Sequence, residues 1–443
     1  MDRADVRICI DCGLWLWRAG LEEKKMVFEA SALNDCTTAG PTPLMGWQEA
    51  RAIGLSLAGP VDGDVSLPLA QAVGRVTATP CASPVALPLF DNSAMDGFVL
   101  ATSGLTGQGP WTLSVAGRIA AGDTAGTLPR GAALRILTGA PIPAGADAVI
   151  MQEHVRRQGA AIVLDDLPAP GINIRRAGED LVLGGEVLPA GRELGPRELG
   201  VLAATGQSEV TLRRRVRVAL LCSGSELREP GEVLAPGQIW NANRYLLTAA
   251  LALPWVELVD LGAVPDNPAR LAAALNHASR TADLVISTGG MADGDEDHMP
   301  RLLREGGGSV QALRVAIKPG KPVGIGTLGG AIYVGLPGNP VAAFVTWLML
   351  GAPLLRKLAG ITDPLPVFQT ARLSAPLIRR PGRAEFRPAS LRPAGPDGLP
   401  VAELMAPNFA ARIALLASAD GLALIPADAD RLDAGAHIDF LRF

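Results

Sequence analysis

Residues 216–222, with the sequence VRVALLC, are the first of several short apolar runs that alternate with helical patterns. Apolar strands that alternate with helices predict a parallel sheet with helices on both faces. The pattern places further strands at 256–261, 283–287, 311–317 and 331–335, and helices at 242–252, 267–279, 297–304 and 340–358.

The segments on either side of this α/β region have a different pattern. Between residues 98 and 165, short alternating runs are split by glycine and proline, which is typical of a small antiparallel β domain. The last part of the chain, 367–443, also consists of short β runs. The sequence therefore predicts an α/β multidomain protein, with an extension lacking regular structure at 1–40, a linker domain at 45–90 and 170–212, an inserted β domain at 91–169, a sheet domain at 213–360 and a C-terminal β domain at 361–443.

Composition excludes several classes of function. The chain has 443 residues, is 48% hydrophobic and carries a net charge of −4 without a basic stripe, which argues against nucleic acid as a partner. No uninterrupted apolar run reaches the roughly 18–20 residues of a membrane span, and 341–355 is expected to be a buried helix. The first thirty residues contain six acids and resemble no secretory signal, so we expect a cytoplasmic protein.

The predicted parallel sheet would bring several polar loops together. Loops that leave the carboxyl ends of parallel strands share one edge, where such proteins bind ligands. These loops contain Glu226, Asp266, Gly289, Gly290 and a group of acids that includes Asp297. Glycines allow backbone N–H groups to approach an anion closely.

Lysine is rare in this chain, with five lysines against thirty-five arginines, yet Lys318 and Lys321 lie three residues apart in KPGKP. Lysine is expected to persist where a compact charge with rotatable donors is needed. Both ammonium groups are predicted at the carboxyl end of the strand at 311–317. A solvated turn with two ordinary lysines is the alternative.

The segment Pro337-Gly338-Asn339-Pro340 begins the helix at 340–358. Asn339 suits the N-cap and Pro340 the first turn, so a well-capped helix is one interpretation. The other is an oxyanion held at the helix N-terminus beside the lysines. Nearby carboxylates would suit Mg²⁺, which prefers one or two carboxylates together with substrate and water.

A second group of polar residues lies upstream, in the segments 91–97, 137–143 and 173–180. The last of these contains two arginines suited to bidentate anion contacts. Each segment, taken alone, is equally compatible with turn formation.

Taken together, these segments resemble the MoeA-type molybdopterin molybdenumtransferases and the C-terminal domain of gephyrin. The matching blocks occur in family order over roughly residues 45–443: FDNSAMDGF at 90–98, LTGAPIPAGADAVIMQE at 137–153, NIRRAGED at 173–180, GQIWNAN at 237–243, STGG at 287–290, KPGKP at 318–322 and GLPGNPVAAF at 335–344.

The resemblance implies a homodimer of elongated, four-domain subunits. Such an enzyme takes adenylylated molybdopterin and molybdate, inserts the metal into the dithiolene with Mg²⁺, and releases AMP. The related molybdopterin adenylyltransferase is a candidate partner. By matched motif, one subunit would supply Asp96, Thr138, Arg175 and Asp180, and the other Glu226, Asp266, Asp297, Lys318, Lys321, Pro337 and Pro340.

Roles follow for these residues as hypotheses. Lys318 and Lys321 would hold the charge of molybdate or phosphate, and Arg175 would add an anion contact. Asp266, Asp297 and Glu226 would organise Mg²⁺, with Asp96 as a further catalytic residue. The remaining substrate contacts would come from Thr138, Asp180, Gly289, Gly290, Pro337, Gly338, Asn339 and Pro340.

The chain departs from the family pattern at several positions. Ser225 replaces an acid, Ala292 and Ala342 replace serines, and a C-terminal serine near residue 411 is not evident. Asp293 is an added acid that would restore the charge missing at Ser225.

Two other functions remain open from the sequence. The adenylyltransferase shares the sheet domain, but the long N-terminal part and residues 367–443 argue against it. A non-catalytic pterin-binding or scaffold protein is compatible with the departures at Ser225 and Ala292.

Overall fold

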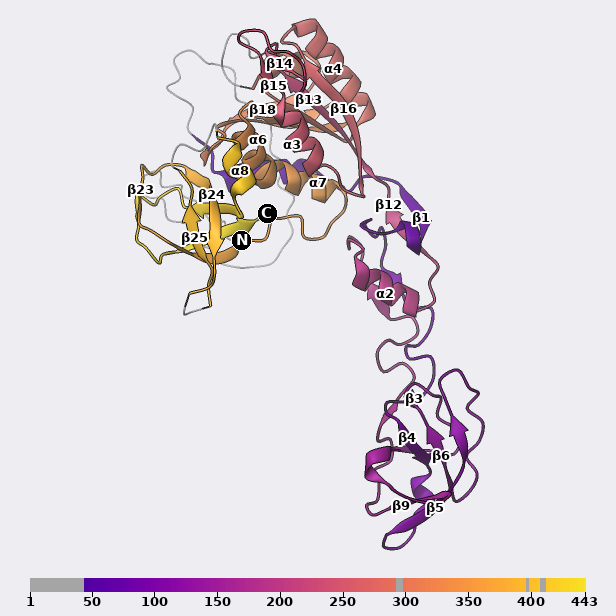
Figure 1. Ribbon diagram of the computed structural model, residues 1–443. Coiled ribbons are helices and arrows are strands. Elements are labelled where there is room, and N and C mark those ends of the chain that lie inside the picture. The colour runs from indigo at the N-terminus through magenta and orange to yellow at the C-terminus, as the bar shows by residue number, and fades with distance from the viewer. Residues whose placement is uncertain (1–43, 292–297, 396–397, 407–411) are drawn as a thin grey trace, which may run out of the picture. The chain divides into compact units, whose positions relative to one another are not determined.

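The computed structural model describes residues 44–291, 298–395, 398–406 and 412–443 (Figure 1). The central domain contains a six-stranded sheet in the order β16-β13-β17-β21-β20-β18. Its strands are β13 (Val216–Ser223), β16 (Val256–Val264), β17 (Leu284–Thr288), β18 (Ser309–Arg314), β20 (Pro322–Leu328) and β21 (Ala331–Leu336).

The sheet is mixed rather than wholly parallel. The four strands β16, β13, β17 and β21 are parallel neighbours, as the sequence predicted. β20 is an additional strand, antiparallel to both β21 and β18. The sequence analysis missed β20, although Gly329 and Gly330 between two apolar runs are a hairpin signal.

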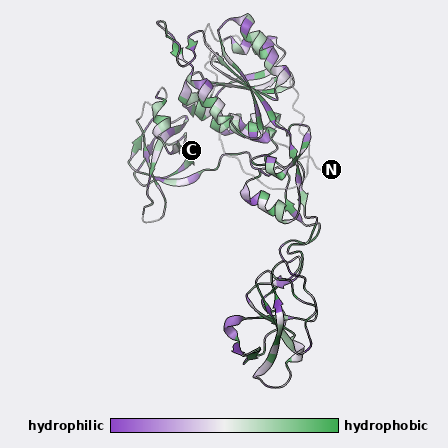
Figure 2. Cartoon of the chain, turned by 45° about the vertical axis from the view of Figure 1, so that its right-hand side comes forward, coloured by the Kyte–Doolittle hydropathy of each residue, from purple (hydrophilic) through white to green (hydrophobic). Residues whose placement is uncertain are grey.

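Helices cover both faces of this sheet because successive strand residues point to opposite sides. Along β13, Val218 and Leu220 pack into one buried cluster, whereas Ala219 and Leu221 pack into another. Hydrophobic strands lie between amphipathic helices in Figure 2. The helices are α3 (Ala242–Ala250), α4 (Pro268–Thr281), α5 (Met299–Glu305), α6 (Pro340–Thr346) and α7 (Ala352–Leu358), with a π-helical turn at Trp347–Gly351 between the last two.

The helical run Pro340–Leu358 is the one described segment long and apolar enough to cross a membrane by length and composition. In the structure, 72% of its most apolar window is buried inside the protein. Val341, Ala343 and Leu354 are among its fully buried residues. The run is therefore a core helix of this domain, as the sequence predicted.

The upstream β domain has a six-stranded sheet in the order β7-β4-β6-β5-β9-β8. All its pairings are antiparallel except β5 with β6. The strands are β4 (Gly97–Leu100), β5 (Trp111–Ile119), β6 (Ala132–Ile136), β7 (Ala148–Met151), β8 (Arg156–Gln158) and β9 (Ala161–Leu164).

Two passages of chain, before and after this β domain, pair with each other in three short antiparallel ladders. The ladders join β1 (Asp64–Pro68) to β12 (Glu209–Arg213), β2 (Cys81–Ala82) to β11 (Glu186–Leu188), and β3 (Asn92–Ser93) to β10 (Ile174–Arg175). The helix α2 (Pro196–Ala204) belongs to this region. The first helix, α1 (Trp47–Leu57), instead packs on the central domain, where a methyl group at Gly54 would lie 2.9 Å from Leu354 Cδ1.

The C-terminal domain is a small β barrel. Its strands follow the order β19-β24-β25-β22-β28-β26, and an additional pairing of β24 with β26 closes the sheet. They are β19 (Ile317–Lys318), β22 (Gln369–Leu373), β24 (Ala384–Arg392), β25 (Val401–Leu404), β26 (Gly421–Ile425) and β28 (His437–Arg442), with a short pair β23 (Leu377–Ile378) and β27 (Arg431–Leu432) and the helix α8 (Ala414–Ser418) beside them.

The two residues of β19 come from the connection between β18 and β20 of the central sheet. The sequence analysis predicted one strand over 311–317, and this was wrong. β18 ends at Arg314, and Ile317 pairs with Ala384 of the C-terminal barrel. The local sequence cannot show that the two ends of 311–317 pair in different sheets, because the partner of the second end lies 67 residues away.

Candidate active site

A cavity of about 310 Å³ opens at the carboxyl edge of the central sheet, where the loops after β13, β17 and β21 meet. This is the edge at which the sequence predicted a site. The predicted site residues that line the cavity are Glu226, Asp266, Gly289, Gly290, Pro337 and Gly338.

Asp266, in the loop after β16, joins its own loop to the loop after β13. Its Oδ1 accepts a 2.6 Å hydrogen bond from Ser223 Oγ, and its Oδ2 accepts a 2.8 Å bond from the Ser225 N–H. Ser225 Oγ in turn accepts a 3.0 Å bond from the Asp266 N–H. The serine that replaces the expected acid therefore forms a reciprocal link between two pocket loops.

Gly289 allows the loop after β17 to lie directly against the loop after β13. Its φ of +93° is in the region that favours glycine, and a Cβ would lie 2.5 Å from the backbone oxygen of Ser223. Gly224, on the opposite loop, is covered by the Glu226 carboxylate, whose Oε2 would lie 2.6 Å from a Cβ there. The backbone contact between Gly289 and Ser223, together with the Glu226 carboxylate, therefore forms this wall of the pocket.

Asn243, near the start of α3, connects two further loops of the pocket. Its Nδ2 donates to Thr288 Oγ1 and to the Gly338 carbonyl, both at 2.8 Å. Thr288 Oγ1 donates to the Pro337 carbonyl at 2.9 Å. The sequence analysis did not select Asn243 as a site residue, although it lies in the quoted GQIWNAN segment, because a polar residue two positions into a helix resembles ordinary capping.

Asn339 caps α6, as the sequence predicted. Its Oδ1 accepts hydrogen bonds from the N–H groups of Val341 at 3.1 Å and Ala342 at 3.4 Å, and Pro340 is the first helical residue. The cap thus satisfies two of the N–H groups that an oxyanion would otherwise use.

The lysine connection, residues 315–321, borders the same edge. A Cβ at Gly320 would lie 3.4 Å from the Ala342 carbonyl and 3.6 Å from Pro337 Cγ, which places this connection against the start of α6. Pro322, which follows Lys321, lines the cavity, whereas neither lysine does. Lys318 Nζ lies 3.3 Å from Glu385 Oε2 of the C-terminal barrel. The sequence analysis did not identify Glu385.

In the upstream β domain, Asp96 and Thr138 form a direct contact. One carboxylate oxygen of Asp96 accepts hydrogen bonds from the Thr138 N–H at 2.7 Å and from its hydroxyl at 2.8 Å. These two bonds lower the pKa of Asp96. Two predicted site residues, 42 positions apart in the chain, are therefore neighbours.

Arg175 and Asp180 are exposed in the segment that follows this domain. Arg175 pairs through its backbone with Asn92. The neighbouring Arg176 forms a 2.6 Å ion pair with Asp91. Of the two arginines in this motif, Arg176 therefore has a structural partner, and Arg175 is the better candidate for an anion contact.

Asp297, the cluster of acids at 293–297, and Ala292 lie outside the described residues. Within the described part of the chain, no group of three or more His, Cys, Asp or Glu residues could hold a metal ion. Glu226 and Asp266 nevertheless line one cavity, and two carboxylates are a donor set that suits Mg²⁺. Burial raises the pKa of the pocket thiol Cys222 to about 11, so it stays protonated at neutral pH.

The mixed sheet and its edge pocket define an α/β ligand-binding domain, which here lies between an N-terminal β region and a C-terminal barrel. Three family models match these parts in order: the MoeA N-terminal region, domains I and II, at residues 45–206; a probable molybdopterin binding domain at 219–357; and the MoeA C-terminal region, domain IV, at 370–443. The chain belongs to the MoeA family of molybdopterin molybdenumtransferases.

Individual relatives agree with this assignment. The molybdopterin molybdenumtransferase of Haemophilus influenzae is 45% identical over 72% of this chain and 80% of its own length. Molybdopterin molybdenumtransferase 2 of Mycobacterium tuberculosis is 37% identical over 84% of this chain and 94% of its own length. A crystal structure of the molybdopterin biosynthesis MoeA protein from Pyrococcus horikoshii matches with a TM-score of 0.78 at 27% identity, covering 90% of this chain and 100% of that one.

Proposed function

We propose that this protein is a molybdopterin molybdenumtransferase, which inserts molybdate into adenylylated molybdopterin and releases AMP. The observation that carries the proposal is the pocket at the sheet edge. It combines two carboxylates, the close backbone contact between Gly289 and Ser223, and an adjoining connection that contains both lysines.

The pocket residues would act mainly by positioning and by electrostatic stabilisation. Lys318 and Lys321 would balance the charge of molybdate or phosphate. The links made by Asp266 and Asn243 would hold the loops in place before the substrate arrives. A water oxygen would then bond to the adenylyl phosphorus as the phosphoanhydride bond breaks, so that AMP leaves and the pterin keeps its own phosphate.

Mg²⁺ is proposed as the metal, held by Glu226 and Asp266 with Asp297 as a further ligand. Each Asp266 oxygen accepts one protein hydrogen bond, and a carboxylate oxygen has a second lone pair that can bind a cation. When bound, Mg²⁺ would neutralise charge on the phosphate oxygens.

We further propose a homodimer in which Asp96, Thr138, Arg175 and Asp180 of one subunit complete the pocket of the other. Asp96 and Thr138, which flank β4 and β6 of a different sheet from the pocket loops, contact each other, so they would reach such a pocket together. A cytoplasmic location and an adenylyltransferase partner that supplies the substrate remain part of the proposal.

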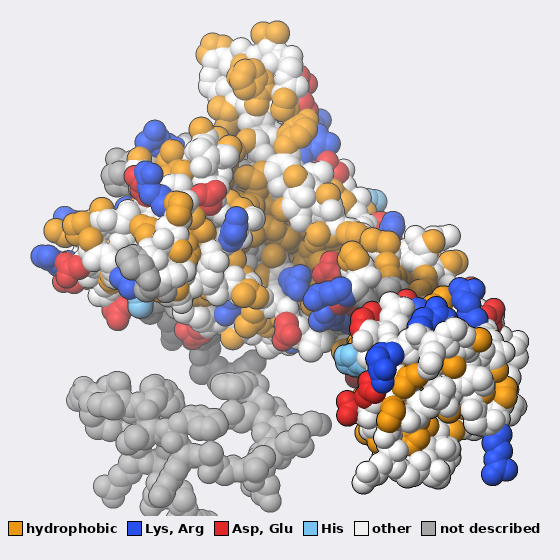
Figure 3. Space-filling view, turned by 60° about the horizontal axis from the view of Figure 1, so that its bottom comes forward, with side chains coloured by type: hydrophobic (Ala, Val, Ile, Leu, Met, Phe, Trp, Pro, Cys, Tyr) orange, Lys and Arg blue, Asp and Glu red, His pale blue; other side chains and the backbone are white. Residues whose placement is uncertain are grey.

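In Figure 3, lysines and arginines are interspersed with acids and hydrophobic side chains over the described residues of the face in view. No continuous basic band crosses this view. A small anionic substrate that enters one pocket is consistent with such a surface.

The two other functions considered above are less well supported. A molybdopterin adenylyltransferase would share the binding domain, but this chain also matches the N- and C-terminal MoeA regions on either side of it. A scaffold protein would bind adenylylated molybdopterin without turning it over. An assay of turnover therefore separates a scaffold from a molybdenumtransferase.

The decisive assay incubates the purified protein with adenylylated molybdopterin, molybdate and Mg²⁺ and measures AMP. We expect release of AMP that depends on molybdate. Lys318→Ala and Lys321→Ala should each abolish this release, because each removes charge that would hold the anion.

Lys357→Ala is the matched control. Lys357 donates to the Leu55 carbonyl at 2.6 Å, so it serves a structural contact between α7 and α1. The control variant should keep its molybdate-dependent turnover. Full activity in either lysine-connection variant would contradict the assigned roles, and binding of the pterin without turnover by the wild-type protein would favour the scaffold.

A further inference from the structure

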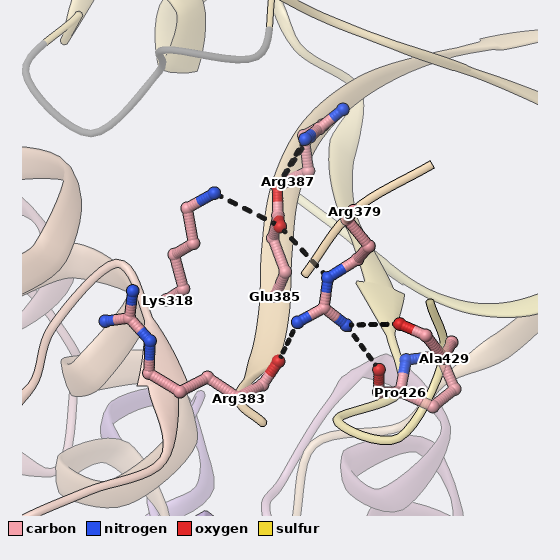
Figure 4. A network of polar contacts seen from close by, with 7 residues as sticks. All are labelled: Lys318, Arg379, Arg383, Glu385, Arg387, Pro426 and Ala429. Atoms are coloured by element: carbon pink, nitrogen blue, oxygen red, sulfur yellow. Dashed lines mark hydrogen bonds and ion pairs between the residues drawn. The ribbon is translucent and has the colours of Figure 1, made fainter. Parts of the chain in front are cut away.

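Glu385, in β24 of the C-terminal barrel, is a buried carboxylate surrounded by cations (Figure 4). Its side chain is 1% exposed. Arg387 Nη2 lies 2.5 Å from Glu385 Oε1, while Lys318 Nζ lies 3.3 Å and Arg379 Nε 3.6 Å from Oε2. One buried carboxylate from the barrel therefore contacts a lysine from the central domain.

The two oxygens of this carboxylate have different partners. Oε1 accepts two hydrogen bonds from Arg387, through Nε at 2.8 Å and Nη2 at 2.5 Å. Both donors of this charge-assisted contact reach the same oxygen, so the contact holds Oε1 in place. Oε2 is thereby directed toward Lys318 and Arg379.

Arg379 is itself held by backbone carbonyl groups. Its Nη1 donates to Pro426 at 2.6 Å and to Ala429 at 3.3 Å, and its Nη2 donates to the Arg383 carbonyl. Side-chain exposures of 7% for both Arg379 and Arg387 show that the frame around Glu385 is buried. The carboxylate therefore has little freedom to turn away from Lys318.

The backbone aligns the same pair. β19 and β24 are parallel, and Lys318 is the register partner of Glu385. A lysine side chain has a flexible four-carbon stem and would otherwise sample many rotamers. The backbone pairing and the ion pair together restrict the ammonium group to one region beside the barrel.

We propose that Glu385 is a positioning residue, which orients the Lys318 ammonium for the anion that this lysine binds. The inference rests on the proposed function for the identity of the anion, but the link between Glu385 and Lys318 can be tested without it. An ammonium group has three donors, so the contact with Glu385 does not by itself prevent it from binding an anion. With 37% of its side chain exposed, Lys318 is still accessible.

The first test measures the chemical reactivity of the lysines. Sulfosuccinimidyl acetate would be added to wild-type protein and to Glu385→Gln, and acetylation of Lys318, Lys321 and Lys357 would be followed by mass spectrometry. The amine must leave Glu385 before it can react, so the variant should acetylate Lys318 about tenfold faster, the factor expected for loss of one charged hydrogen bond. The rates at Lys321 and Lys357 should not change.

Glu403→Gln is the matched control. Glu403 lies in the same barrel, but its side chain is 46% exposed. Its ion-pair partner is Arg392 of the barrel rather than a lysine of residues 315–321. This variant should leave the Lys318 rate unchanged. An equal Lys318 rate in wild-type protein and folded Glu385→Gln would overturn the proposal.

Substitution of a buried carboxylate can also prevent folding, because Arg387 would lose its charged partner. Thermal unfolding would detect such a failure. Glu385→Asp retains the charge on a shorter side chain, and the proposal then requires a Lys318 acetylation rate between those of folded and of denatured wild-type protein. A rate equal to that of the wild-type protein in this variant would count against it.

The second test separates positioning from structural support. If Glu385 orients Lys318 toward the anion, Glu385→Gln should raise the KM for molybdate by about tenfold with a smaller change in kcat. A purely structural role would lower kcat in proportion to the folded fraction and leave KM unchanged. If the wild-type protein releases no AMP, the proposed function fails, while the acetylation result still decides the link between Glu385 and Lys318.

Discussion

At the scale of single residues, Asp283 shows how one carboxylate can hold the start of a sheet. It lies just before β17 and accepts hydrogen bonds from Arg214 Nη1 at 2.7 Å, Arg214 Nη2 at 2.8 Å and the Arg217 N–H at 2.8 Å. Burial alone would raise the pKa of Asp283, but the hydrogen bonds from Arg214 and Arg217 outweigh it, so its pKa lies below the ordinary 3.8. The ionised form is thus stabilised in the folded state.

Asp283→Asn should lower the free energy of unfolding by about 2 kcal/mol at neutral pH, because charged hydrogen bonds are lost at a side chain only 15% exposed. A lowered folded-state pKa contributes stability above the ordinary carboxyl pKa, and this stability is lost as the pH falls through the lowered value. The difference between wild type and variant should therefore shrink below about pH 4. Denaturant unfolding across pH 3–7 measures it.

Asp165→Asn is the control for this prediction. Asp165 pairs with Arg156, but both side chains are more than half exposed, so water screens the pair. If the difference in free energy of unfolding between wild type and Asp283→Asn stayed constant down to pH 3, the contribution of Asp283 to stability would not be electrostatic.

Some single residues of the site could be predicted from the sequence, and others could not. Asn339 and Pro340 were predictable because capping depends on neighbours in the chain. Asn243 and Glu385 were not, because their partners Gly338 and Lys318 are 95 and 67 residues away. A buried ion pair has no local signature, and a glutamate in an alternating strand resembles a solvent-facing residue.

At the scale of elements, the pocket depends on the close approach of two loops at Gly289. We expect Gly289→Ala to reduce AMP release by at least about tenfold, since small displacements at a site have large effects on rate. The added Cβ would meet the Ser223 carbonyl at 2.5 Å and push the loop after β13 away from the loop after β17. The measurement is the rate of AMP release, together with thermal unfolding.

Gly231→Ala provides a matched control, because Gly231 has a similar φ of +96° but no atom within 4 Å of a Cβ. Both variants carry the backbone strain of an alanine at positive φ, about 1 kcal/mol. Only the first creates a collision in the pocket. Equal losses of activity would mean that strain, rather than the contact between loops, controls the site.

The elements themselves were largely predictable where the pattern was local. The apolar runs at β13, β17 and β21 predicted parallel strands of one sheet, and the structure confirms them. The split of 311–317 into β18 and β19 could not be predicted, because each part finds its partner through tertiary contacts. The order of strands in a mixed sheet likewise depends on contacts distant in the sequence.

At the scale of the whole molecule, the proposed dimer predicts complementation between damaged subunits. Asp96→Asn and Lys321→Ala should each be inactive as pure proteins. Mixed and allowed to exchange, half of the dimers would carry one substitution on each subunit. Each of these dimers would contain one pocket with both changes and one pocket with neither.

The mixture should therefore recover about one quarter of wild-type AMP release. The control is a mixture of Lys318→Ala and Lys321→Ala, because both lysines would belong to the sheet domain of one subunit. This mixture should recover no AMP release. No recovery in the first mixture, despite exchange shown by mass spectrometry, would mean that each pocket is completed within its own chain.

The pairing of β19 with β24 also has a consequence for the order of synthesis. Most of the central domain can assemble once the ribosome has passed Leu358, and domains generally fold as they emerge. The lysine connection cannot, because the strand that pairs with Lys318 begins only at Ala384. A nascent chain should thus hold a nearly finished sheet with an unfinished anion-binding segment, so that the pocket becomes competent only after β24 has been synthesised.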